Sequence, residues 1–307
     1  MSVQVENLLK CYQEQRAVND VSFSIETGEV VGFLGPNGAG KSTTMKIITC
    51  YMSPTSGDVR IGQHSILDAA AEIKKKVGYL PESNPLYTDM AVMDFLYFSA
   101  EIQGVGSSRI PGRIREMVDV CGLGSEKHKK IGELSKGYKQ RVGLAQAMIH
   151  DPEVLILDEP TSGLDPNQIV EIRKLIKELG KEKTVILSSH ILSEVELTCD
   201  RIIIINRGRI VADGKGEELR KGLDKREVVE IRIEFEGGTE EVKKALLGIA
   251  SVEQVDEEDG GAFQVRSKPG LSSRKELFEL CVKKGWNLLG LSKQETRLED
   301  VFKELTQ

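Results

Sequence analysis

One stretch of the sequence decides the fold, and it reads Gly35-Pro36-Asn37-Gly38-Ala39-Gly40-Lys41-Ser42-Thr43. It matches the pattern G-x-x-x-x-G-K-[ST], in which glycines let the backbone curl until several N–H groups face inward. Together with the positive end of the following helix dipole, these donors form a site for phosphate groups. Lys41 adds a full positive charge at the outer phosphates, and the Ser42 hydroxyl is placed to ligate Mg²⁺. We therefore expect this stretch to bind a nucleotide through its phosphates.

The flanking sequence supports this interpretation. Residues 29–34 are mostly apolar and partly β-branched, which predicts a buried strand, and residues 44–48 continue as the first turns of a helix. A phosphate loop needs this strand–loop–helix context. The alternative, a glycine-rich turn that binds nothing, would explain neither the flanks nor the agreement at every fixed position.

Length and composition predict a soluble globular protein with two domains. The 307 residues leave room for a domain of about 200 residues and a second, smaller one. Hydrophobic residues make up 39% of the chain and charged residues 29%, which is ordinary for a globular protein. The net charge is −6 and the sequence contains no basic block, so a nucleic-acid-binding surface is not expected.

The cysteines and the apolar runs indicate the cellular compartment in which the protein is expected to work. The 5 cysteines are far apart and form no C-x-x-C, so we expect neither a zinc site nor a disulfide framework, and a reducing cytoplasm fits. The start of the chain lacks the profile of a signal peptide. No apolar run approaches the roughly 18–20 residues of a membrane span. If the protein acts at a membrane, another chain must provide the membrane-spanning part.

Hydrophobic periodicity predicts a sheet domain with a helical insertion. We expect strands over residues 3–5, 18–25, 58–62, 77–82, 154–159, 184–190, 200–207 and 209–212, and helices over 91–121, 140–149 and 168–179. The strand before Asp158 and Glu159 is apolar throughout, as in a parallel sheet that is buried on both faces. Its two carboxylates follow at the carboxyl end, where open α/β sheets place their ligands. Ser135 is expected to cap the helix that follows it.

The charged, glycine-containing residues 214–226 read as a linker to a second domain. Beyond it we expect a strand over 228–235, helices over 240–249, 273–284 and 298–305, and a hairpin at Gly260-Gly261 with Phe263 and Val265 on the return strand. These elements predict a small α+β domain without a catalytic motif.

Five motifs in order resemble the nucleotide-binding subunits of ABC transporters. They are the phosphate loop 35–43, the signature 134–138, the strand with carboxylates 154–159, the turn 162–165 and the switch His190. The resemblance covers about residues 1–215. The tail 298–305 is similar to the end of ATPases that pair with ABC-2 type permeases, including gliding-motility and multidrug export types.

The resemblance implies an α/β P-loop NTPase fold, that of an ABC ATPase. It places the ATPase domain at residues 1–218, with a helical subdomain inserted at about 84–150. The strand and helix patterns beyond the linker place the small α+β accessory domain at 226–307. The resemblance implies a subunit that binds and hydrolyses ATP with Mg²⁺ and powers export through a separate membrane permease. Such a subunit sits at the cytoplasmic face of the cell membrane as a homodimer or heterodimer, and binds no nucleic acid.

The resemblance also implies the chemistry of three residues. Asp158 would hold Mg²⁺ opposite Ser42. Glu159 would orient or deprotonate the attacking water, a general-base role typically worth about 10²–10⁴ in rate. His190 would contact the γ-phosphate and hold Glu159 and the water in line. The alternatives are a strand that merely ends in two acids and a histidine with a structural role.

Further residues would complete the ATP site. Tyr12 would stack on the adenine, with core packing as the alternative. Ser135 and Gly137 of one copy would meet the γ-phosphate bound by the other copy, and Asp165 would act across the same interface. Glu82 stands at the lid position and would reach the metal through a water. Its alternative is a glutamate on a surface loop.

Two motifs depart from the family pattern. The usual signature is LSGGQ, whereas this chain has Leu-Ser-Lys-Gly-Tyr, so Lys136 and Tyr138 replace a small residue and an amide. The lid position usually carries a glutamine, and Glu82 adds a negative charge near the triphosphate.

Two rival interpretations remain. A soluble ABC ATPase that acts on ribosomes or nucleic acid would resemble tandem ATPase domains or carry a long coiled-coil insertion. This sequence has one ATPase domain and no heptad run. A regulator that does not hydrolyse ATP is disfavoured, because Lys41, Asp158, Glu159 and His190 are all present.

Overall fold

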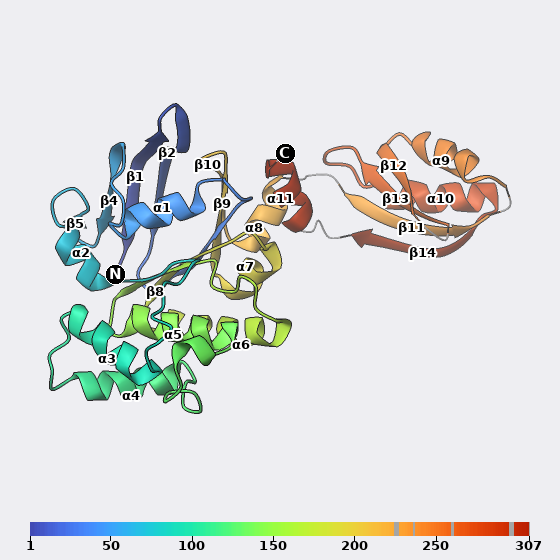
Figure 1. The fold of residues 1–307 in the computed structure, drawn as a ribbon. Coiled ribbons are helices and arrows are strands. Elements are labelled where there is room, and N and C mark those ends of the chain that lie inside the picture. Colours follow the sequence, from blue (N-terminus) through green and yellow to red (C-terminus); the bar gives the residue numbers. More distant parts are fainter. Residues whose placement is uncertain (224–226, 236, 259–260, 295–297, 307) are drawn as a thin grey trace. The chain divides into compact units, whose positions relative to one another are not determined.

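The computed structural model describes residues 1–223, 227–235, 237–258, 261–294 and 298–306. The chain forms two compact units (Figure 1). The first unit comprises Met1–Gly216 together with Leu305–Gln307, and the second comprises Glu217–Glu304. No helix among the described residues is long and apolar enough to cross a membrane.

A six-stranded sheet forms the centre of the first unit. Its order is β10 (Arg209–Gly214), β9 (Arg201–Asn206), β3 (Val30–Leu34), β8 (Thr184–Ser189), β7 (Val154–Asp158) and β6 (Val77–Leu80). All neighbours pair in parallel except β9 and β10, which form an antiparallel hairpin. Every residue of β3, β7 and β8 is buried, which confirms the prediction of strands covered on both faces.

A second, antiparallel sheet lies against the first. It contains β2 (Gln15–Ile25), β1 (Val3–Tyr12), β4 (Ser56–Ile61) and β5 (His64–Ser65), in that order. The strand predicted over residues 3–5 is longer and continues to Tyr12. Asn7 has a φ of 47°, and the pairing of β1 with β2 shifts between Val5 and Leu8. This irregularity interrupts the alternation of apolar side chains and explains why the sequence predicted only the first part of the strand.

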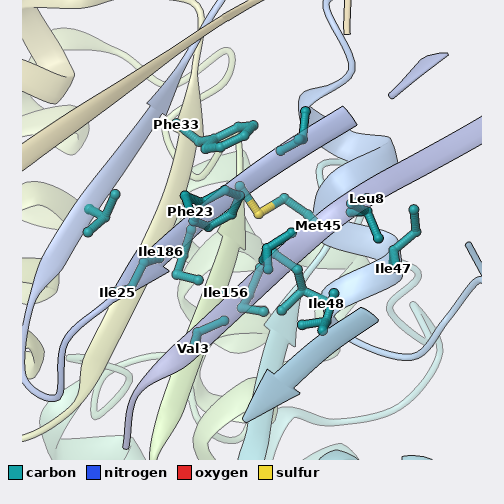
Figure 2. Close-up of a cluster of buried hydrophobic side chains, with 14 of the residues drawn as sticks. Val3, Leu8, Phe23, Ile25, Phe33, Met45, Ile47, Ile48, Ile156 and Ile186 are labelled. Carbon is teal, nitrogen blue, oxygen red and sulfur yellow. The ribbon is translucent and has the colours of Figure 1, made fainter. Parts of the chain in front are cut away.

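The main core lies between the two sheets and the helix α1 (Lys41–Ile48) (Figure 2). Phe23 of β2 and Phe33 of β3 lie with their ring centroids 5.5 Å apart. Met45 of α1 is fully buried in the same cluster. The phosphate loop joins β3 to α1, so packing of this helix fixes the loop from its carboxyl end.

Helices cover the other face of the central sheet (Figure 1). They include α5 (Lys136–Met148), α6 (Pro166–Gly180) and α7 (Leu192–Thr198). A Cβ atom on Gly32 of β3 would lie 2.1 Å from Val195 of α7. Only glycine therefore lets α7 approach the sheet this closely.

The helical segment between β6 and β7 is divided further than the sequence predicted. It contains α3 (Val92–Ile102), α4 (Ile110–Val120), the short 3₁₀ helix η1 (Ile131–Glu133) and α5, and a further helix, α2 (Ala70–Lys76), lies just before β6. The helical pattern over 91–121 is two helices, because Gly104 with a φ of 73° ends the first one. Helix α5 begins at Lys136, four residues before the predicted start. The Ser135 side chain accepts a hydrogen bond from Tyr138 N at 3.4 Å, which confirms the predicted cap.

The predicted linker 214–226 is partly wrong. Residues Gly216–Leu223 form the helix α8, and Leu219 is buried. The charge-rich composition of this segment concealed the apolar side of the helix. The rest of the predicted linker, residues 224–226, lies outside the described residues.

The second unit has its own sheet and core. Its elements are β11 (Val228–Glu234), α9 (Thr239–Leu247), β12 (Val252–Glu258), β13 (Ala262–Ser267), α10 (Arg274–Lys284) and β14 (Asn287–Gln294). The strands are antiparallel in the order β12-β13-β11-β14, which with the βαββαβ sequence is the ferredoxin-like arrangement. Phe263 and Val265 lie on the predicted return strand, and their side chains are buried in this core. The predicted turn falls at Gly260, which lies outside the described residues, and at Gly261. The last helix, α11, spans Leu298–Thr306.

Candidate active site

The phosphate loop leaves the carboxyl end of β3 and enters α1. Gly40 has a φ of 110°, and a Cβ atom there would lie 2.5 Å from Ala17 O. Glycine is therefore the residue type that fits, for both conformation and space. The Lys41 side chain is buried and its Nζ donates to Gly35 O at 2.8 Å and Pro36 O at 3.3 Å. The loop thus curls around its own lysine.

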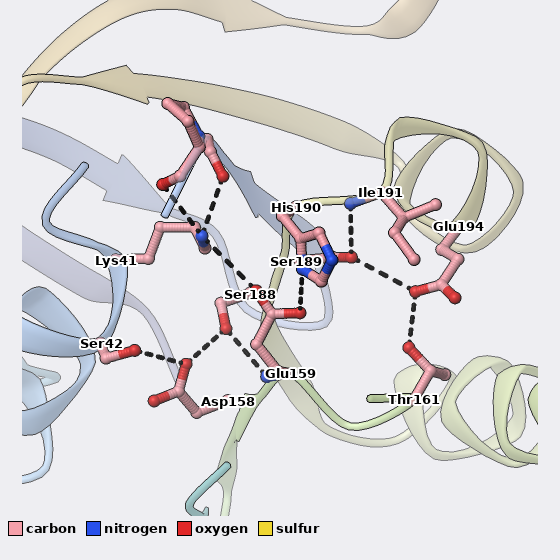
Figure 3. Close-up of polar contacts among 12 residues, drawn as sticks. Lys41, Ser42, Asp158, Glu159, Thr161, Ser188, Ser189, His190, Ile191 and Glu194 are labelled. Atoms are coloured by element: carbon pink, nitrogen blue, oxygen red, sulfur yellow. Dashed lines mark hydrogen bonds and ion pairs between the residues drawn. The ribbon is translucent and has the colours of Figure 1, made fainter. Parts of the chain in front are cut away.

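Asp158 lies beside this loop. It is the last residue of β7, which β8 separates from β3 in the sheet. Its carboxylate is 1% exposed and accepts hydrogen bonds from Ser42 Oγ at 3.1 Å and Ser188 Oγ at 2.6 Å (Figure 3). A hydroxyl and a carboxylate oxygen at this distance are the hard ligands that Mg²⁺ uses beside substrate phosphates and water. The donor set of Ser42 and Asp158 therefore fits Mg²⁺. The described residues contain no group of three or more His, Cys, Asp or Glu side chains arranged to hold a metal ion by themselves.

Glu159 lies between two basic side chains. Its Oε1 is 3.4 Å from Lys41 Nζ, and its Oε2 is 2.9 Å from His190 Nδ1 (Figure 3). Its backbone has a φ of 49°, and its N–H donates to Ser188 Oγ at 2.9 Å. This conformation turns the chain sharply after β7 and brings a nearly buried carboxylate to the phosphate loop.

A cavity of about 610 Å³ lies in front of these groups, which is a usual size for a small-molecule site. Of the described residues, those that line it are Tyr12, Gln15, Ala17, Asn37, Gly38, Gly40, Lys41, Ser42, Thr43, Glu82, Glu159, Ser162 and His190. The structure thus brings together in one cavity most of the residues that the sequence predicted. Four predicted residues near the cavity do not line it. Gly35, Pro36 and Ala39 belong to the same phosphate loop, and Asp158 lies at the same edge of the sheet.

Tyr12 stands at the end of β1, at the rim of this cavity. Its side chain is exposed, so the alternative of core packing does not apply. The hydroxyl contacts Met52 Sδ at 2.9 Å, and Lys10 Nζ lies 5.6 Å from the ring centroid. A half-exposed ring with one face at a cavity is available for stacking.

Three further predicted residues, away from the phosphate loop and Asp158, are also not among those that line the cavity. Ser135 caps α5, and Asp165 forms a capping box with Gln168 at the start of α6. A Cβ atom on Gly137 would lie 2.6 Å from the Gln168 side chain, and one on Gly163 would lie 2.0 Å from Lys136 Nζ. The signature and the interface turn are therefore adjacent, and together form one surface at the amino ends of α5 and α6.

Sequence reasoning missed several residues at the site. Gln15 and Ala17 line the cavity from β2. The Ser188 hydroxyl donates to Asp158 and accepts from the backbone N–H of Glu159. The Thr161 hydroxyl donates to Glu194 in a buried network behind the site. Ser188 lies at the carboxyl end of the buried strand β8, as Asp158 does on β7, and this shared position was the signal that could have identified it.

Tyr79 on β6 has a buried hydroxyl group near the carboxylate of Asp158. Burial raises the pKa of its phenol, and the negative charge of Asp158 raises it further. The hydroxyl has no hydrogen-bond partner among the described residues. Tyr79 therefore stays neutral and adds no charge near Asp158.

The fold and this site define a class of protein. A phosphate loop follows one strand of the mainly parallel sheet. A buried aspartate with an adjacent glutamate lies at the end of another strand. This is the arrangement of a P-loop nucleoside triphosphatase.

Comparison with known proteins identifies the family. The family described as ABC transporter matches residues 18–162. An uncharacterized ABC transporter ATP-binding protein of Bacillus subtilis (strain 168), YxlF, is 34% identical over 299 residues, which is 97% of this chain and 97% of the relative. The linearmycin resistance ATP-binding protein LnrL of the same organism is 33% identical over 311 residues, covering 99% of this chain and 98% of the relative. The chain belongs to the ABC transporter family, as one of its ATP-binding proteins.

A solved structure shares the fold of the first unit. It is a dimeric post-hydrolysis state of the ATP-binding cassette MJ0796 bound to ADP and Pi. It is 27% identical, with a TM-score of 0.64, and covers 69% of this chain and 98% of that chain. The predicted fold class is thereby confirmed.

Proposed function

We propose that this chain is the subunit that hydrolyses ATP to power export through a separate membrane permease. The observation that carries the proposal is the convergence of Lys41, Glu159 and His190 on one cavity, with Ser42 and Asp158 bonded to each other beside it. This set contains a cation for the phosphates, a candidate base, and two oxygen ligands for a metal.

The chain's own residues suggest the mechanism. Inward-facing N–H groups of the loop bind the phosphates, and Lys41 exchanges its carbonyl partners for phosphate oxygens. Bound Mg²⁺, held by Ser42 and Asp158, would neutralise charge on the β- and γ-phosphates. Glu159 orients the attacking water and accepts its proton, and His190 holds the carboxylate in line. Catalysis then comes mainly from positioning and electrostatics.

We propose that two ATPase subunits complete each ATP site. Ser135 and Asp165 are exposed at the amino ends of α5 and α6, Gly137 lies in the first turn of α5, and none of the three lines the cavity of its own chain. The surface at these amino ends carries free helix N–H groups, which suit a γ-phosphate held by a partner. The dimeric relative bound to ADP and Pi supports this arrangement. The partner is a second copy of this chain or a different ATPase subunit.

The proposed assembly places the chain at the cytoplasmic face of the membrane. We assign residues 1–218 to the ATPase domain, with the helical subdomain at about 84–150, and residues 226–307 to an accessory domain. A resistance protein among the relatives supports outward transport, because a transporter protects a cell by lowering the internal concentration of a compound. The similarity of the tail 298–305 favours an ABC-2 type permease as the partner.

The test compares the parent chain with Lys41→Ala in ATP binding and hydrolysis. The variant lacks the charge that the loop directs at the β- and γ-phosphates, so we expect weaker ATP binding and no hydrolysis. Lys46→Ala is the matched control, because it removes a lysine from the same helix at a position outside the cavity lining. Parent-level turnover in Lys41→Ala would reject the site. Co-purification with ribosomes or nucleic acid in place of a membrane protein would favour the rival function.

A further inference from the structure

A buried carboxylate lies behind the nucleotide cavity, outside its lining. Glu194 of α7 is 7% exposed. Its Oε2 accepts hydrogen bonds from Thr161 Oγ1 at 2.5 Å and from Ser189 Oγ at 3.2 Å (Figure 3). Thr161 follows Glu159 by two residues, and Ser189 directly precedes His190. One carboxylate oxygen therefore joins the two loops that carry the proposed base and its partner.

Packing of α7 does not require a carboxylate at this position. The helix packs on β3 through Val195, which fills the space left by Gly32. Burying a charged carboxylate costs several kcal/mol unless its oxygens accept hydrogen bonds. An apolar residue at position 194 would avoid this cost. The presence of a glutamate is explained by the two hydroxyl groups that it binds.

The loop after β7 needs such support. Glu159 has a φ of 49°, and a non-glycine residue in this region costs of order 1–3 kcal/mol unless its surroundings hold it there. Before the turn, Ser188 Oγ accepts from Glu159 N. After the turn, Ser162 N donates to Glu159 O at 3.1 Å, and Thr161 between them is fixed by Glu194.

The turn that carries His190 depends on the same carboxylate. Ser189 Oγ donates to Glu194 and accepts from Ile191 N at 3.0 Å, so the hydroxyl bridges the two sides of His190. The 2.9 Å contact between His190 Nδ1 and Glu159 Oε2 thus joins two turns that both depend on Glu194.

We propose that Glu194 is a positioning residue for ATP hydrolysis, acting through Thr161 and Ser189 to hold Glu159 and His190 in line with each other. The inference rests on the proposed function. It assigns to Glu194 no contact with the nucleotide, so loss of the network affects the chemical step and leaves binding in place.

The test uses isosteric pairs of variants. Thr161→Val keeps the shape of the side chain and removes the hydroxyl, and Thr161→Ser retains the hydroxyl. We expect Thr161→Val to lower kcat for ATP hydrolysis by about 10- to 100-fold, the range for a small misplacement of catalytic groups. KM should stay close to that of the parent, because Thr161 does not line the cavity. Thr161→Ser should restore kcat.

A second arm tests the carboxylate itself. Glu194→Leu should reproduce the loss of kcat, whereas Glu194→Gln, which keeps an acceptor oxygen, should retain more activity. The double variant Thr161→Val with Glu194→Leu should lose no more than the worse single variant, because both changes remove the same bond. If Glu194→Leu does not fold, the Thr161 pair decides the question alone.

Thr198→Val is the matched control. It removes a buried hydroxyl from the same helix, one that donates to Glu194 O at 2.6 Å and does not reach the two loops. We expect parent kcat for this variant. The stoichiometry of ATP binding and the melting temperature of each variant separate misfolding from a loss of chemistry.

The outcomes distinguish the inference from the function on which it rests. Parent kcat in Thr161→Val, or an equal loss in Thr161→Ser or Thr198→Val, would overturn the role of Glu194. A parent chain that does not hydrolyse ATP, or a Glu159→Gln variant as active as the parent, would instead overturn the proposed function.

Discussion

The charged groups at the site compensate one another. Lys41 forms an ion pair with Glu159 and donates hydrogen bonds to two backbone carbonyls, and Asp158 accepts from two hydroxyls. A triphosphate therefore has to displace Glu159 and the carbonyls from Lys41 when it binds. In the proposed mechanism the same displacement would free Glu159 to meet a water, so that Lys41 would link nucleotide binding to preparation of the proposed base.

Tyr12 should contribute to ATP affinity through its ring. We expect Tyr12→Ala to weaken ATP binding by about 1–3 kcal/mol, the range for stacking of a base on an aromatic ring. Turnover at saturating ATP should change little, because stacking on the adenine would stabilise bound ATP and the transition state alike. Tyr12→Trp should restore the affinity, as measured by calorimetry or a fluorescent ATP analogue.

Tyr51→Ala provides the control for Tyr12. Tyr51 is the more exposed of the two tyrosines, at 74% against 43%, and it does not line the cavity. Its loss should leave ATP affinity unchanged. Equal affinity in the parent, Tyr12→Ala and Tyr51→Ala would mean that the adenine lies elsewhere.

At the scale of elements, the sequence predicted what is buried and missed much of what is exposed. The strands β3 and β7 are apolar at almost every position and β8 has an apolar centre, so these buried strands could be predicted directly. Strand β14 has no buried residue, because it is the edge of its sheet, and the sequence therefore contained no signal for it. Helices α2 and α7 are only seven residues long, too short for a clear helical period.

The candidate site was predictable to a similar extent. The phosphate loop and the two carboxylates form local patterns, and the structure brings them together as expected. Glu194 could not be found in this way. Its partners Thr161 and Ser189 are 33 and 5 residues away in sequence, and only the folded chain brings all three side chains together.

The segment after β6 carries Glu82 at the cavity. We expect Glu82→Gln to keep ATP hydrolysis and to bind ATP at least as well as the parent, because the change removes a negative charge near the triphosphate. The larger effect should be on coupling to transport, measured in vesicles with the permease, since the resemblance to ABC ATPases implies that this lid loop contacts the permease. Glu153→Gln is the control, because Glu153 pairs with Lys76 and does not line the cavity. Complete loss of ATPase activity in Glu82→Gln alone would give Glu82 a direct catalytic role.

At the scale of the whole molecule, each unit has a core of its own. The core of the second unit is built from β11, β12, β13, α9 and α10 and includes Phe263 and Leu277. It contributes no residue to the lining of the nucleotide cavity among the described residues. The chain is thus organised as an ATPase unit followed by a module that is folded around separate side chains.

A chain that ends at residue 225 should therefore bind ATP as the full chain does. Its melting temperature should be slightly lower, because Asn206 Nδ2 loses its hydrogen bond to Leu305 O at 3.1 Å, a contact worth about 1 kcal/mol. Asn206→Ala in the full chain removes the same bond and should reproduce that part of the shift. A shortened chain that is folded by circular dichroism but does not bind ATP would refute the assignment of nucleotide binding to the first unit.

The assembled state provides the last prediction. Glu159→Gln keeps the size of the side chain and removes the base, so ATP and Mg²⁺ should bind while hydrolysis slows by about 10²–10⁴. If each ATP bridges two subunits, bound ATP stabilises the dimer by mass action, and hydrolysis no longer removes it. Light scattering should then detect a dimer of Glu159→Gln with ATP and a monomer with ADP.

The surface at the amino end of α5 supplies the control for that dimer. Ser135 is exposed, and adding Ser135→Arg to Glu159→Gln should abolish the dimer, because a bulky side chain would block the helix end that meets the γ-phosphate. Ser107→Arg makes the same change at an exposed position between α3 and α4 and should leave the dimer intact. Loss of the Ser135 cap also lowers stability by about 1 kcal/mol, so each variant is first checked by its melting temperature and by ATP binding. A dimer that persists with ADP and tolerates Ser135→Arg would be held together by a different surface, and the shared ATP site would have to be abandoned.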